Sequence, residues 1–117
     1  MNKNKEILDK IKSDILSKKI LLLSIGIKDD IFGKYYLVMG YKKINGNKYL
    51  IIDLFFYRTY SNSRIHIYFH NFETDDKKNV LYITSEDDNL FGFLQDVYKF
   101  LSLSKDKHSD FFNFIEN

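Results

Sequence analysis

The sequence predicts an α+β domain in which helices cover one face of an antiparallel sheet. The expected order is an N-terminal helix, a meander of about five strands, a C-terminal helix and a short tail helix. Three observations predict it: apolar residues recur at helical spacing near both ends, strand-like apolar runs follow one another between them, and an Asn-Gly pair separates two of these runs. Because no helical segment separates the strands, the pattern favours α+β over βαβ.

Residues 3–18 are predicted to form the first helix, since apolar side chains fall on one face and Lys, Asp and Ser on the other. The apolar run at residues 20–27 follows and predicts a strand.

A tight hairpin is predicted at Asn45-Gly46, because Asn-Gly is the favoured pair for a type I′ turn. A two-residue loop there would place Tyr41 opposite Leu50 and Leu37 opposite Leu54. This register assigns one set of side chains to the core face: Tyr35, Leu37, Met39, Tyr41, Leu50, Ile52, Leu54 and Phe56. It assigns another set to a second face: Tyr36, Val38, Gly40, Lys42, Tyr49, Ile51, Asp53, Phe55 and Tyr57.

Residues 64–70 alternate between apolar and polar side chains, which predicts another strand with Ile65, Ile67 and Phe69 in the core. Pairing of Tyr57 with Arg64 would place His66 opposite Phe55. A short strand at residues 80–84 follows.

Ser85 and the three acidic residues after it are typical of a helix start, so a helix is predicted over about 87–103. The apolar residues at 111–115 predict the tail helix.

Composition limits the classes of protein. A chain of 117 residues is expected to form one domain over residues 1–117. The absence of cysteine excludes disulfides and thiolate metal sites, and no cofactor or metal site is expected. The charged N-terminus and the lack of a long apolar run predict a cytoplasmic protein without a membrane contact.

The net charge is only +2, and 16 of the 18 basic residues are Lys. Lys, Asn, Ile, Phe and Tyr supply 60 of the 117 residues, and all five have A/T-rich codons. This composition indicates an AT-rich genome, such as that of a low-GC bacterium or a phage, so the many lysines need not indicate an acidic partner.

The second face carries the candidate binding residues, and Tyr36 would lie beside them. The predicted set is Tyr49, Asp53, Phe55, Tyr57, Arg64, His66, Tyr68 and His70. His66 and His70 lie four residues apart on one strand, about 13 Å, and therefore cannot share a metal ion.

Three interpretations fit this face. The main one is a non-enzymatic protein that binds another protein, of the inhibitor, immunity or adaptor type, or that pairs with a second copy as a homodimer. It rests on the strand at residues 49–57, which is apolar on both faces and therefore needs a cover from the tail or from another chain. The alternative is single-stranded nucleic-acid binding by the aromatic and basic side chains. The third is a metal-free hydrolase or isomerase that uses His66 and Asp53.

Overall fold

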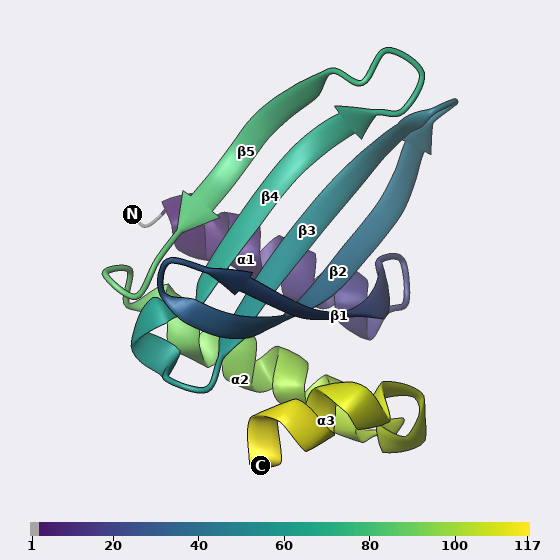
Figure 1. Cartoon of the computed structure of the whole chain (residues 1–117). Helices are drawn as coiled ribbons and strands as arrows, with labels where there is room; N and C mark the ends of the chain where they lie inside the picture. The colour runs from purple at the N-terminus through teal and green to yellow at the C-terminus, as the bar shows by residue number, and fades with distance from the viewer. Residues whose placement is uncertain (1–2) are drawn as a thin grey trace.

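Five antiparallel strands form one sheet in the order β1-β2-β3-β4-β5, and three helices pack on one of its faces (Figure 1). The structure is a computed structural model and describes residues 3–117. Its elements are α1 (Lys3–Leu16), β1 (Leu21–Asp30), β2 (Gly33–Asn45), β3 (Lys48–Tyr57), β4 (Arg64–Asn71), β5 (Lys77–Ile83), α2 (Asn89–Ser102) and α3 (Ser109–Glu116), with short 3₁₀ turns η1 (Tyr60–Asn62) and η2 (Lys105–His108). This confirms the predicted α+β class. No helix in the described range is long and apolar enough to span a membrane.

The hydrophobic core lies between the helices and the sheet. Each helix contributes an apolar stripe, and α3 seats Phe111 edge-on against Tyr36, with ring centroids 5.4 Å apart. The sheet contributes buried side chains from its four later strands: Tyr36, Val38, Leu50, Ile52, Leu54, Phe56, Ile65, Ile67, Leu81 and Ile83. The tail helix therefore covers the core face and not the opposite face.

The observed pairing of β2 with β3 is shifted by one residue from the predicted pairing. The side chains of β2 therefore lie on the faces opposite to those predicted. The observed pairs include Tyr41 with Ile51 and Val38 with Leu54. The turn residues are Gly46 and Asn47, and a bulge lies between Lys43 and Asn45. The bulge inserts one residue into β2, and one residue reverses which side chains of that strand face the helices.

The core assignment for β2 is corrected accordingly. Tyr36 and Val38 are buried beneath the helices, and Gly40 lies between Ile20 and Ile52. Tyr35, Leu37, Met39 and Tyr41, which the sequence assigned to the core face, lie on the opposite face.

The pairing of β3 with β4 differs from the prediction by two residues, which keeps each side chain on its predicted face. Phe55, not Tyr57, pairs with Arg64, and Asp53 pairs with His66. The reason is local: the N–H of Tyr57 donates to Ser63 Oγ at 3.3 Å, so this residue pairs with Tyr35 of β2 but not with β4.

The start of α2 also differs from the prediction. The helix begins at Asn89, and Ser85 makes no capping hydrogen bond within the described residues. Asp87 makes a hydrogen bond to the start of the helix instead, because its Oδ1 accepts from the N–H of Asn89 at 2.8 Å. Its Oδ2 accepts from Asn4 Nδ2 at 2.8 Å and thereby joins α2 to α1.

The sheet is curled, so β1 reaches across to β4. Arg64 of β4 forms a 2.7 Å ion pair with Asp30 at the end of β1, although β2 and β3 separate the two strands. A bulge between Ser24 and Gly26 contributes to the bend, and Gly26 adopts a φ of 140° that other residues resist.

One buried carboxylate connects α1 to β2. The Asp14 side chain is 3% exposed and accepts from Lys42 Nζ at 3.0 Å and from Lys10 Nζ at 3.2 Å. The hydrogen bond from Lys42 lowers the pKa of Asp14, against the opposing effect of burial.

We expect Asp14→Asn to lower the free energy of unfolding at pH 7 by about 1–3 kcal/mol, because it removes two charge-assisted hydrogen bonds. A lowered pKa in the folded state adds stability above the unfolded pKa of about 3.9, and that stability is lost as pH falls through the folded pKa. Urea unfolding at pH 7 and at about pH 2 checks this; a difference from wild type that persists undiminished in acid contradicts it.

The hairpin turn gives a second prediction. Gly46 is the first central residue of the turn and has a φ of 53°, which costs a β-branched residue about 1–2 kcal/mol. Gly46→Val should therefore lower the denaturation midpoint, whereas Asn45→Val, at a strand position, should change it little. Equal midpoints for both variants would show that the positive φ is absent in solution.

Candidate functional site

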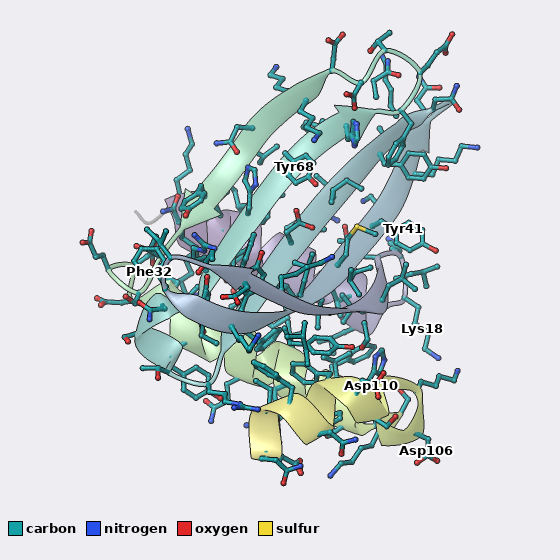
Figure 2. All side chains as sticks on the ribbon, in the orientation of Figure 1. Lys18, Phe32, Tyr41, Tyr68, Asp106 and Asp110 are labelled. Carbon is teal, nitrogen blue, oxygen red and sulfur yellow. The ribbon has the colours of Figure 1, made fainter. Side chains whose placement is uncertain are left out.

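The face of the sheet opposite the helices is called the open face below, because no helix of residues 3–117 packs on it. Figure 2 shows Tyr41 and Tyr68 on this side of the sheet, with α1 behind it. The strand pairing assigns to it Leu21, Leu23, Lys28, Asp30, Tyr35, Leu37, Met39, Tyr41, Lys43, Tyr49, Ile51, Asp53, Phe55, Tyr57, Arg64, His66, Tyr68, His70, Lys77, Asn79 and Tyr82.

All eight predicted binding residues lie on the open face. They come from β3 and β4, where the predicted parity is right: Tyr49, Asp53, Phe55, Tyr57, Arg64, His66, Tyr68 and His70. Tyr36, which was predicted beside them, is buried in the core. The β2 bulge replaces it on this face with Tyr35.

At one end of the face, Arg64 forms the centre of a polar and aromatic cluster. Its Nη2 donates to Asp30 at 2.7 Å and to the Tyr57 hydroxyl at 2.9 Å, and Tyr57 donates to the same carboxylate. The guanidinium lies 4.4 Å from the centre of the Phe55 ring, within range of a cation–π contact. Tyr35 packs against both Phe55 and Tyr57, with centroids 5.1 Å apart in each case.

These contacts hold the charges of the cluster in place. Burial alone would raise the pKa of Asp30, but the hydrogen bonds from Tyr57 and from the Phe32 N–H, with Arg64 nearby, lower it overall. Burial and the bond to Asp30 raise the pKa of Tyr57. Asp30 and Arg64 therefore stay ionised and bind each other at this end of the face, while Arg64 Nε is buried without a hydrogen-bond partner among the described residues.

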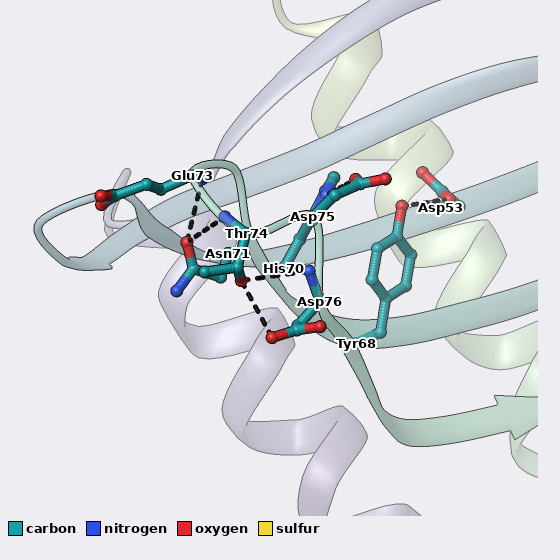
Figure 3. A network of polar contacts seen from close by, with 8 residues as sticks. All are labelled: Asp53, Tyr68, His70, Asn71, Glu73, Thr74, Asp75 and Asp76. Carbon is teal, nitrogen blue, oxygen red and sulfur yellow. Dashed lines mark hydrogen bonds and ion pairs between the residues drawn. The ribbon is translucent and has the colours of Figure 1, made fainter.

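In the middle of the face lies a carboxylate that water reaches poorly. Asp53 accepts a hydrogen bond from the Tyr68 hydroxyl at 3.0 Å (Figure 3). Burial raises the pKa of Asp53, although Tyr68 and His66 act in the opposite direction. Burial, followed by the charge of Asp53, raises the pKa of Tyr68.

A row of rings runs along β4. His66 lies 4.7 Å from Tyr68 and 5.7 Å from Tyr82, and His70 lies 4.2 Å from Phe72, all between ring centroids. Tyr49 continues the row from β3, 5.0 Å from Phe72. The rings hold one another in fixed positions, so the face presents a preformed aromatic surface.

Polar contacts at the far end fix the last ring of β4. His70 Nε2 lies 2.8 Å from Asp75 Oδ1 in the loop that follows. Asn71 organises this loop, because its Oδ1 accepts from the N–H groups of Glu73 at 2.9 Å and Thr74 at 3.3 Å (Figure 3). His70 is thus held by its own loop.

The arrangement does not form the acid–base pair that the enzyme interpretation requires. Within the described chain, Asp53 binds Tyr68, and His66 Nε2 lies 2.6 Å from Asn79 Oδ1 instead of the carboxylate. Residues 3–117 also contain no group of three His, Asp or Glu side chains placed to hold a metal ion.

A serine and a histidine meet elsewhere, between β1 and η2, and sequence analysis did not find them because they lie 84 residues apart. Ser24 Oγ and His108 Nδ1 are 2.6 Å apart, beside a cavity of about 440 Å³ that Arg58, Asp110 and Asn113 help to line. Burial lowers the pKa of His108. No hydrogen bond among the described residues reaches His108 Nε2, so the pair lacks the orienting group of a hydrolase triad. Its evident role is to join η2 to β1.

The aliphatic side chains that β1 and β2 place on the open face were not among the predicted binding residues. β1 contributes Leu21 and Leu23, which are 49% and 43% exposed, and β2 contributes Leu37 and Met39. Tyr82 of β5 was missed as well and is 49% exposed. The sequence shows that alternate residues of β1 and β2 lie on opposite faces. The bulge between Lys43 and Asn45 decides which of the two sets of β2 side chains lies on the open face.

Comparison of the chain with protein-family models, curated proteins and solved structures found no match.

Asp53 offers a test of the burial of the open face. Because its pKa is raised in the folded state, wild-type stability should fall as pH rises through that pKa, and Asp53→Asn should remove this loss. We expect Asp53→Asn to match or exceed the melting temperature of wild type at pH 7 and to match it at about pH 3. Asp14→Asn, with the opposite sign, is the control. A large destabilisation by Asp53→Asn at pH 7 would show that the ionised carboxylate is needed.

Proposed function

We propose that the protein is a small binding protein that acts by docking the open face onto another protein. The observation that carries the proposal is the one-sided packing: three helices cover the core face, while the open face exposes aromatic and aliphatic side chains. Leu21, Leu23 and Tyr82 are each more than 40% exposed, and clustered exposed apolar side chains are typical of interaction sites.

The composition of the open face supports a protein partner. Tyr is enriched at protein interfaces, and it occurs here among aliphatic residues. The rings of His66, Tyr68 and Tyr82 pack on one another, so little conformational entropy remains to be lost on binding. Inhibitors, immunity proteins and adaptors act through preformed surfaces of this kind.

The nucleic-acid alternative has less support on the same face. Stacking of bases requires accessible rings, and Leu21, Leu23 and Met39 add aliphatic side chains to the face that cannot stack on a base. Arg64, the one arginine on the face, is already engaged by Asp30.

A photoreactive amino acid placed on the open face tests the proposal. We would replace Tyr82 by a benzophenone side chain, irradiate cells that express the protein, identify the captured protein and measure its affinity with purified components. Position 103, where Leu103 is 82% exposed at the end of α2, is the matched control.

We expect Tyr82→Glu to weaken binding of the captured protein by about 100-fold or more, because it replaces an exposed aromatic ring of the contact by a carboxylate. Leu103→Glu should leave the affinity unchanged, and circular dichroism should show both variants folded. A partner captured from position 103 alone, or one indifferent to Tyr82→Glu, would contradict the proposal.

A further inference from the structure

We propose that the partner of the open face is an acidic protein surface, which places carboxylates over Lys43 and Lys77 at the β2–β3 end of the sheet and over Lys28 on β1. This inference rests on the proposed function and specifies the chemistry of the partner. It follows from the exposed lysines of the face, which form no ion pair within 4.0 Å among the described residues, and from the hydrogen bonds that its aspartates accept.

The open face carries three lysines besides Arg64, and the charge of one of them, Lys77, acts to lower the pKa of Asp53 and of Asp75. Lys28, Lys43 and Lys77 are exposed, and none of them forms an ion pair within 4.0 Å in the described part of the chain. The strand pairing directs Lys43 to the same side as Tyr49, and Lys77 to the same side as His70. They therefore flank the aromatic row.

The acids in the same region are occupied. Asp30 is held by Arg64 and Tyr57, Asp53 accepts from Tyr68, and Asp75 is paired with His70. The strand residues on the open face include four Lys or Arg and two Asp, and the β4–β5 loop adds Asp75 beside His70. Basic residues outnumber acidic ones on this face, and its exposed lysines form no ion pair within 4.0 Å among the described residues, which favours carboxylates on the partner.

The same pattern argues against a second copy of this chain. A two-fold dimer through the open face would bring its available lysines against an identical face on which the acids are already satisfied. The aliphatic side chains Leu21, Leu23 and Met39 distinguish an acidic protein from single-stranded nucleic acid, since they offer a partner apolar contact and not base stacking.

The probe is a glutamate–tyrosine copolymer titrated into ¹⁵N-labelled protein at about 50 mM salt and again at about 500 mM, because screening should release a charge-driven contact. We expect amide shifts concentrated on β2–β5 around Lys43 and Lys77. The double variant Lys43→Glu/Lys77→Glu should weaken binding at least about tenfold. The matched control Lys3→Glu/Lys99→Glu, on the helices, should weaken it less than about twofold.

The inference is overturned by any of four results: no saturable binding at low salt, equal weakening by both double variants, tighter binding of oligothymidylate than of the copolymer, or a dimer in sedimentation that Tyr82→Glu dissociates. The captured partner separates this inference from the proposed function. If that partner binds Lys43→Glu/Lys77→Glu as well as wild type but not Tyr82→Glu, the open face is the docking site and its partner is not acidic. If neither variant affects the captured partner, both proposals fail.

Discussion

The extra residue at the bulge between Lys43 and Asn45 decides which side chains of β2 lie beneath the helices. Moving the turn by one residue along the chain shifts the pairing by two and leaves every side chain on its face. One inserted residue reverses the faces of β2 relative to β3. Tyr36 and Val38 enter the core for this reason, and Leu37 and Met39 leave it.

The open face follows from that constraint. Both alternating sets of β2 are apolar or aromatic, so either could have packed against the helices. The helices supply one layer of cover, and the set excluded from it joins the outward residues of β3 and β4. The curl that brings Asp30 to Arg64 then fixes one end of this surface with an ion pair, while the available lysines lie along its rim.

Sequence analysis could predict what depends on local alternation. The order of elements, the helical stripes and the face of every predicted site residue on β3 and β4 were correct, because a two-residue slip preserves parity. The bulge was not predictable, since Lys43-Ile44-Asn45 resembles any strand end. The hydrogen bond between Asp14 and Lys42 joins residues 28 positions apart, and the one between Ser24 and His108 joins residues 84 positions apart. Only the tertiary fold brings the residues of each pair together.

Solvent paramagnetic relaxation at two adjacent methyl-bearing residues tests the account most directly. Val38 is 0% exposed beneath the helices, whereas Met39 is half-buried on the open face. With a soluble gadolinium chelate, we predict that the Met39 methyl relaxes several-fold faster than the Val38 methyls. Equal relaxation, or faster relaxation at Val38, would show that β2 pairs without its bulge and that the open face is not the surface described here.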